Sequence, residues 1–484
     1  MFRINRYKFY ALTLIAVLLF SLAACGANTQ TETETISLDV WTYYNGDQLV
    51  AFNELAQEFN ATVGAEHGII VSNSSVGDVN DLAANVLASA GGKVGSAELP
   101  NIFSAYADTA LEMAKLGLAA DLSPYLTQED CAAYVDSYIQ EGDFFGDGSI
   151  HIFPVAKATE VMLLNKTDWD VFAKETRATY TDISTIEGIV ATAQKYYEWT
   201  DSFTPDKEND GKAFFGRDAM ANYFYAGFMQ LNGELFTVED NSVTLNFDRD
   251  TARVLWDNEY VPFIKGYFAA TGRFRSDDIK TGNILMYIGS SASATFFPKE
   301  VMRDDITSYP IEMEAFPCAQ FAAGKPYAVQ QGAGMVVVDS SPEEVEASVL
   351  FLKWLAEEEQ NIQFSVESGY LPVKKSANNL NVIQTYHPDI NKTVESVLRV
   401  SIETVNENTM YTAKPFQNGE AVRKVLEYSL RDLAAKDRQT VVARLDEGVP
   451  LEQAVEDFVT DEYFERWYQT TLQELTELAE TTQP

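Results

Sequence analysis

Residues 36–59, ISLDVWTYYNGDQLVAFNELAQEF, decide the fold. Residues 36–42 are rich in β-branched and aromatic side chains and predict a strand. Residues 43–46 break that strand, and Asp47 can cap a helix. The apolar residues of this helix recur at helical spacing, at Leu49, Phe52, Leu55 and Phe59. A strand followed at once by an amphipathic helix is the first half of a β-α-β unit.

The same alternation continues along the chain. Residues 68–76 predict a second strand, 79–90 a helix and 101–103 a third strand. This order is typical of an α/β fold with a mostly parallel sheet. Ligands of such sheets bind beyond the carboxyl ends of the strands. The residues that follow these strand ends and would share one rim are Tyr43, Tyr44, Tyr106 and Asp108.

The N-terminus predicts export. A basic start is followed by an apolar segment at 9–22, which has the length of a signal peptide and is too short to span a membrane. Leu22-Ala23-Ala24-Cys25 resembles a bacterial lipobox, in which Cys25 carries the lipid. We therefore predict a signal peptide at 1–24, a lipidated Cys25 with a flexible tether at 25–35, and a location on the extracytoplasmic face of a bacterial cell membrane. The alternative is an ordinary signal peptide that happens to contain a cysteine.

Composition excludes several classes of function. The 484 residues carry a net charge of −37, which repels nucleic acid, and 46% of them are hydrophobic, enough for sizeable cores. With 3 His and 3 Cys we expect no metal site of these ligands. The segment 206–217 begins like a calcium loop, but its twelfth position is Arg217 rather than Glu. No phosphate loop or dinucleotide fingerprint is present, so we expect no cofactor.

Two breaks divide the body into two lobes. A short link at 155–159 predicts a crossover to a second lobe, and residues 316–338 predict the return. Ser341-Pro342-Glu343-Glu344 is a capping box that opens a helix. We place the N-terminal lobe at 36–155 plus 316–368 and the C-terminal lobe at 156–315 plus 369–484.

A series of short motifs runs in a fixed order over about 350 residues: the lipobox, ISLDVWT, LPNIFSAY, LLNK, TGNILMYIGSS, FLKWL and SGYLP. In this order the chain resembles the extracellular solute-binding lipoproteins of ABC importers that bind carbohydrates. The resemblance implies two α/β lobes joined by crossing strands, with a hinge and a ligand in the cleft between the lobes.

The chain is most similar to the glycerol-3-phosphate-binding and sugar-binding members. By motif position, the resemblance places ligand contacts at Ser290, Gly332, Tyr370 and Arg423. The chain departs from the pattern where polar contacts are replaced by Val79, Ala107 and Ala158. These departures put glycerol 3-phosphate itself in doubt and leave room for a larger sugar or a phosphodiester.

The residue types themselves suit a polar solute. Flat aromatic rings suit the apolar faces of sugars, and Asp, Asn and Arg suit their hydroxyls. The aromatic candidates are Trp41, Tyr43, Tyr44, Tyr106 and Tyr370, and the cationic candidates are Lys157, Arg217 and Arg423. Two cations in the cleft would indicate an anionic group on the ligand. We expect Arg273 and Arg275 to pair with Asp277 and Asp278 instead.

Together these patterns predict a monomeric, lipid-anchored receptor that captures a carbohydrate, a polyol or a sugar phosphate and delivers it to a membrane permease. We expect no catalysis. The alternatives are a secreted glycan hydrolase, which needs two carboxylates at catalytic separation, and a surface adhesin or sensor. Cys131 and Cys318 are either a disulfide or two thiols, and we favour thiols.

Overall fold

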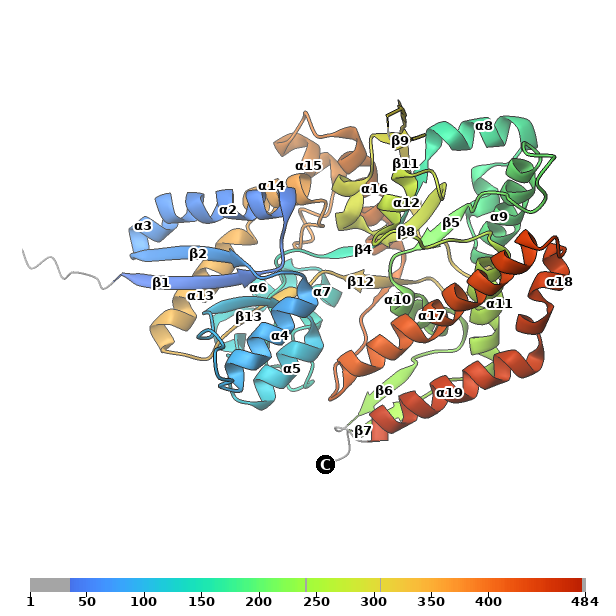
Figure 1. The fold of residues 1–484 in the computed structure, drawn as a ribbon. Coiled ribbons are helices and arrows are strands. Elements are labelled where there is room, and N and C mark those ends of the chain that lie inside the picture. Colours follow the sequence, from blue (N-terminus) through green and yellow to red (C-terminus); the bar gives the residue numbers. More distant parts are fainter. Residues whose placement is uncertain (1–34, 240–241, 305, 481–484) are drawn as a thin grey trace, which may run out of the picture.

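The computed structural model describes residues 35–239, 242–304 and 306–480. The signal peptide, Cys25 and nearly all of the tether lie outside the described residues. The described chain forms two lobes side by side, with β4 (Ala158–Asn165) and β12 (Tyr327–Gln331) between them (Figure 1). The predicted two-lobed α/β architecture is therefore confirmed.

The first lobe contains a four-stranded sheet in the order β13-β3-β1-β2. The first three strands along the chain are parallel, as predicted, and β13 is antiparallel to β3. The strands are β1 (Ile36–Thr42), β2 (Ile69–Ser75), β3 (Ile102–Ala105) and β13 (Gly334–Val337). The helices of this lobe are α2 (Gly46–Ala61), α3 (Val63–His67), α4 (Val79–Ala90), α5 (Ala107–Lys115), α6 (Gln128–Ala133), α7 (Asp136–Gln140), α13 (Pro342–Leu355) and α14 (Glu358–Ser368).

Two helix starts test the capping predictions. The capping box at Ser341 is present, because its side chain accepts from the backbone N–H of Glu344 and the Glu344 side chain accepts from the Ser341 N–H. The cap assigned to Asp47 is wrong. The N-cap of α2 is Asn45, and Asp47 lies inside the first turn, where its negative charge suits the helix dipole.

The second lobe is built on a larger sheet in the order β14-β12-β4-β8-β5, with β11 also paired to β4. The further strands are β5 (Phe215–Arg217), β8 (Met286–Ser290), β11 (Met313–Pro317), β14 (Thr409–Tyr411), the hairpin β6 (Phe236–Glu239) and β7 (Ser242–Leu245), and the pair β9 (Glu300–Met302) and β10 (Ser308–Pro310). The helices are α8 (Lys166–Thr176), α9 (Ile186–Asp201), α10 (Met220–Leu231), α11 (Arg249–Lys265), α12 (Arg275–Lys280), α15 (Leu380–Tyr386), α16 (Lys392–Glu407), α17 (Gly419–Asp446), α18 (Leu451–Val455) and α19 (Asp461–Glu480).

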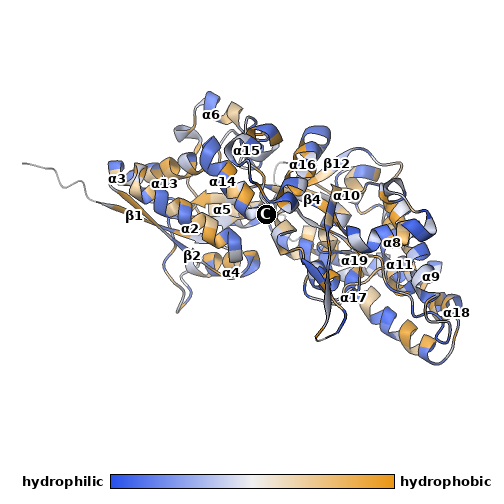
Figure 2. Ribbon diagram, turned by 90° about the horizontal axis from the view of Figure 1, so that it is seen from above, coloured by the Kyte–Doolittle hydropathy of each residue, from blue (hydrophilic) through white to orange (hydrophobic). Residues whose placement is uncertain are grey.

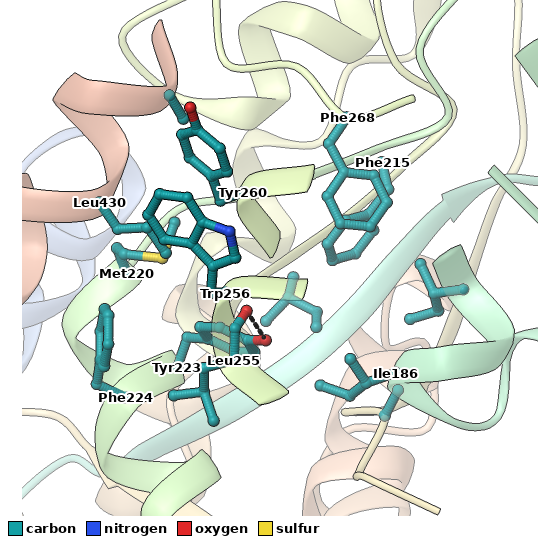
Figure 3. Packing of buried hydrophobic residues seen from close by; sticks show 14 of the residues in the cluster. Ile186, Phe215, Met220, Tyr223, Phe224, Leu255, Trp256, Tyr260, Phe268 and Leu430 are labelled. Atoms are coloured by element: carbon teal, nitrogen blue, oxygen red, sulfur yellow. Dashed lines mark hydrogen bonds between the residues drawn. The ribbon is translucent and has the colours of Figure 1, made fainter. Parts of the chain in front are cut away.

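The core of the second lobe is rich in aromatic residues. Trp256 and Tyr260 stack with their ring centroids 3.7 Å apart, and Met220, Phe224 and Leu430 surround them (Figure 3). In Figure 2, helices such as α11 and α17 alternate between hydrophobic and hydrophilic residues along their length, as amphipathic helices do. Burial of this apolar face holds α17 against α10 and α11.

Three segments of the chain meet where the lobes join. The Lys157 backbone N–H donates to the Leu371 carbonyl at 3.3 Å, and the Lys157 ammonium donates to the Gly332 carbonyl at 2.8 Å. Because β11 and β12 both pair with β4 of the second sheet, the chain returns to the first lobe at Gly332, later than the predicted limit at 316. These three segments form the hinge region.

Two further observations concern the described residues as a whole. No helix in these ranges is both long and apolar enough to cross a bilayer. Cys131 and Cys318 are both free thiols, as favoured from the sequence, and burial raises the pKa of the Cys318 thiol to about 12.

Candidate functional site

Two adjoining cavities lie between the lobes. The central cavity, about 440 Å³, contains Asp108, Asn222 and Arg423 in its lining. The outer cavity, about 1270 Å³, is lined by Tyr43, Ser290 and Tyr370 among others. The two cavities are continuous, because they share the lining residues Tyr106, Asp218, Phe274, Gln331 and Gly332. The shared set comes from both lobes and from the hinge region, so these cavities form one inter-lobe cleft.

Arg423 is held in the central cavity by a short chain of polar contacts. Its guanidinium donates to Asn222 Oδ1 at 2.9 Å, and Asn222 Nδ2 donates to Glu160 Oε1 at 3.0 Å. Glu160 is buried on β4, which raises its pKa, while the Asn222 hydrogen bond and the charge of Arg217 act against that shift. Among the described residues, no carboxylate forms an ion pair with Arg423, so much of its hydrogen-bonding capacity faces the cavity.

Asp108 faces Arg423 from the first lobe. It lies in the first turn of α5, and the Phe416 backbone N–H donates to its carboxylate. Desolvation raises the pKa of Asp108 to about 7, although the Phe416 hydrogen bond and the Arg423 charge lower it, and Glu420 and Glu112 raise it further. The carboxylate also packs directly against Gly419, where a side chain would not fit. Asp108 is therefore a contact between the lobes as well as a cavity residue.

The boundary between the two cavities carries a second carboxylate, Asp218, directly after β5. Desolvation raises its pKa to about 6, and the backbone N–H of Arg275, which donates at 2.9 Å, opposes the shift. Arg275 pairs with Asp278 at 2.7 Å, as predicted. The pairing predicted for Arg273 is wrong, because its exposed side chain reaches across the cleft to Asp78, at 3.7 Å, on the first lobe.

A pair of tyrosines closes the inner wall of the outer cavity. The Tyr43 and Tyr370 hydroxyls are hydrogen-bonded at 3.0 Å, and the Ala333 backbone N–H donates to Tyr43 at 3.4 Å. Burial raises the pKa of both phenols well above their ordinary value, so both remain neutral donors and acceptors. Ser290, at the end of β8, lines the same cavity and accepts from the Ala292 N–H.

Seven of the predicted ligand residues line the cleft: Tyr43, Tyr106, Asp108, Ser290, Gly332, Tyr370 and Arg423. Four do not. Trp41 is buried among residues of α4, α5 and β3, and its indole N–H donates to Asp39. Tyr44 is 1% exposed and packs against Phe52, Phe364 and the far side of Tyr370. The prediction that Tyr44 and Trp41 face the cleft is wrong, because both side chains turn into the hydrophobic core of the first lobe.

The two other predicted ligand residues that do not line the cleft are cations, and each forms a buried ion pair. Lys157 is fully buried in the hinge region and pairs with Glu141. Arg217 pairs with Glu259 at 3.2 Å and lies over the Tyr223 ring, inside the second lobe. Neither lines the cleft, so the expectation that they reach a ligand does not match their positions. Of the three predicted cations only Arg423 does.

Several cleft residues were not singled out from the sequence. They include Glu141, Asn222, Tyr225, Gln331, Tyr411, Glu427 and Tyr428. Most lie on helices or strands of the second lobe, and none carries a local motif. Of these residues, only Glu427 could have been indicated by the sequence. It lies four residues after Arg423, and residues at that spacing are neighbours on one face of a helix.

The positions that depart from the glycerol-3-phosphate pattern fall into two groups. Val79 and Ala107 line the central cavity, where they offer no polar contact to a ligand. Ala158 is fully buried at the start of β4. The cleft therefore differs chemically from the pattern on the side of the first lobe.

The fold and the cleft define a two-lobed binding protein. A profile of the bacterial extracellular solute-binding protein family matches residues 54–393, and the chain belongs to this family. None of the curated proteins compared with the chain matches it in sequence.

Solved structures repeat this architecture. The chain is similar, at 18% identity and a TM-score of 0.65, to the cyclic alpha-maltosyl-1,6-maltose binding protein of Arthrobacter globiformis, covering 92% of this chain and 99% of that one. At the same identity and TM-score it is similar to UgpB from Mycobacterium tuberculosis in complex with glycerophosphocholine, covering 90% and 98%. The Listeria monocytogenes protein Lmo0181 in complex with cycloalternan has 16% identity and a TM-score of 0.62, covering 90% and 99%. These likenesses establish the fold.

Proposed function

We propose that the protein is the receptor of an ABC importer and captures a neutral carbohydrate in the inter-lobe cleft. The observation that carries this proposal is the lining of the cleft, where aromatic rings, hydroxyls and the guanidinium groups of Arg273 and Arg423 face a shared space between the lobes. Contacts from both lobes let a ligand stabilise a closed arrangement about the hinge region.

The charges of the central cavity favour a neutral ligand over a phosphate. Its lining carries the cations Arg423 and Lys424 and the carboxylates Asp108, Glu141, Asp218, Glu420 and Glu427. A phosphate beside Arg423 would be repelled by these carboxylates, which would weaken its binding. The hydroxyls of a sugar can instead donate hydrogen bonds to them. The structures of similar fold include complexes with maltotriose or cycloalternan and one with glycerophosphocholine, so a phosphodiester is the second candidate.

Purified protein is tested by thermal unfolding with sugars, polyols and their phosphates. A ligand at 100 times its Kd stabilises the folded state by about 2.7 kcal/mol, which is a clear rise in Tm. We expect neutral oligosaccharides to raise Tm and to be recovered chemically unchanged. A panel without any shift contradicts the proposal, and cleavage of the glycan favours the hydrolase.

The remaining parts of the proposal concern the cell. Cys25 anchors the monomeric receptor to the outer face of the membrane through lipid, and the receptor delivers its solute to permease subunits. Its support is the lipobox-like sequence ahead of the tether. In cells fed a labelled fatty acid, the wild-type protein should carry the label and the Cys25→Ser variant should be released unlabelled.

A further inference from the structure

A third cavity, about 960 Å³, adjoins the central cavity; we call it the lower cavity. It lies between the first lobe, at α5, α7 and residues 143–146, and the second lobe, at the β6–β7 hairpin and residues 410–417. It shares Ala107, Glu141, Gln330, Thr412 and Ala413 with the central cavity. The central cavity therefore adjoins the outer cavity as well as the lower cavity, and all three lie along the inter-lobe cleft.

Exposed aromatic rings are concentrated along this route. Eight aromatic side chains are strongly exposed within the described ranges, and five of them line the three cavities: Tyr106, Phe145, Phe274, Phe296 and Tyr428. Leaving an aromatic ring in water forfeits its burial energy, so a row of such rings along a cleft indicates a ligand that covers them. A ligand with repeated flat apolar faces and polar edges fits this row.

Phe145 is presented to the lower cavity by a fixed platform. Its ring lies 4.8 Å from Phe144, and Phe144 stacks on the His151 ring at 5.5 Å. His151 is buried, and its Nδ1 is hydrogen-bonded to the Ala120 carbonyl at 3.1 Å. Asp143 accepts from the Gly146 and Gly148 backbone N–H groups, which shapes the loop that carries the phenylalanines. The exposed ring is thus held in place rather than left on a free loop.

Unpartnered polar atoms provide a second, independent observation. Among the described residues, Ser137 Oγ, Gln330 Oε1 and Thr412 Oγ1 are buried without a hydrogen-bond partner, and all three residues line the lower cavity. Buried polar groups without partners are rare because each has lost its hydrogen bonds to water without replacing them. Gln330 and Thr412 also line the central cavity, so these atoms lie where the two cavities join.

We propose that the lower cavity is an outer subsite for carbohydrate, in which a sugar ring covers Phe145 and its hydroxyls bond to Gln330, Thr412 and Ser137. This inference rests on the proposed function and deepens it, because it makes the ligand an oligosaccharide whose chain extends beyond the central cavity. The central cavity alone matches a small ligand, whereas the continuous cleft has room for several sugar units.

The test compares substitutions of two exposed phenylalanines, each of which contacts a neighbouring aromatic ring edge-on. Phe145→Ala removes the platform ring, while Phe203→Ala is the control, because Phe203 lies outside the three cavities and contacts Trp199 at 4.7 Å in the same edge-on geometry. Binding is measured by calorimetry with gluco- and manno-oligosaccharides, from the disaccharide to the hexasaccharide, using the mature protein.

The wild type and Phe203→Ala should bind longer chains more tightly than short ones. Phe145→Ala should bind the disaccharide normally and bind the longest chains about five- to tenfold more weakly. Ser137→Ala, at a residue that lines the lower cavity but not the central one, should reproduce the length-dependent loss. If Phe145→Ala binds all lengths as the wild type does, this inference is overturned and the proposed function stands. If no oligosaccharide binds the wild type, both are overturned.

Discussion

Lys157 in the hinge region and Arg423 in the central cavity are both cations at the boundary of the two lobes, yet they have opposite surroundings. Lys157 is fully buried, pairs with Glu141 and donates to the Gly332 carbonyl. Arg423 has one hydrogen bond to Asn222 and faces open space. The difference teaches that charge near a cleft can serve the fold or the ligand, and that the partners of the charge decide which.

The largest expected effect is on stability, from Lys157→Met. The substitution leaves Glu141 buried without its ion-pair partner, so we expect the free energy of unfolding to fall by about 3–5 kcal/mol in urea titrations. Lys157→Met combined with Glu141→Gln should recover part of the loss, because no unpaired charge remains. A single variant as stable as the wild type would break the comparison.

The matching substitution in the cleft, Arg423→Met, should leave stability within about 1 kcal/mol, because the residue has no ion pair among the described residues. Affinity for the ligand found in the thermal panel should fall, since a charged hydrogen bond contributes about 1.5–3 kcal/mol, or roughly tenfold to a hundredfold in Kd. Calorimetry measures the loss. Lys436→Met, a change of an exposed cation on the same helix but outside the three cavities, is the control.

Asp108 sharpens the comparison through pH. Its pKa is raised from 3.8 to about 7 in the folded state, so the folded protein holds this proton more tightly than the unfolded chain. The stability from this group is present below about pH 4 and is lost as the pH rises through 7. Between pH 5 and pH 8 we expect Asp108→Asn to gain about 2 kcal/mol relative to the wild type in urea titrations. A constant difference would contradict the desolvation of this carboxyl as the cause of its raised pKa.

The smallest effect concerns the tyrosine pair of the outer cavity. Tyr43→Phe removes one hydrogen bond to Tyr370 and one from the Ala333 N–H, and we expect a loss of about 1 kcal/mol in the free energy of unfolding. Tyr44→Phe is the control, because no hydrogen bond of its hydroxyl is among the described contacts and its ring keeps its packing. Equal losses in the two variants would show that the Tyr43 pair contributes nothing specific.

The order of strands and helices could be predicted because it depends on local patterns. The strand over 36–42 and the helix over 79–90 have the predicted bounds, and the two-lobed α/β fold follows from the alternation. The site was less predictable. Tyr43 and Tyr44 are adjacent, and only the way the chain leaves β1 decides that the first faces the cleft and the second enters the core.

Long-range partners account for the other differences. Lys157 pairs with Glu141, 16 residues away, and Arg217 pairs with Glu259, 42 residues away, and no local pattern announces either pair. Asn222 is a site residue because the packing of α10 against α17 brings it to Arg423, and this packing is not evident in the sequence. The motif-based residues Ser290, Gly332, Tyr370 and Arg423 all line the cleft. Order along the chain therefore carried more information about the site than residue type alone.

Gly332 has a φ of +87°, and a methyl group at this position would meet the Ala156 carbonyl oxygen at 2.8 Å and Lys157 Cα at 3.0 Å. The two backbone segments of the hinge region are therefore in close contact at Gly332, and no side chain fits between them. Rotation of the lobes about this contact would displace parts in proportion to their distance from it, so Gln331, next to Gly332, should move little when the cleft closes.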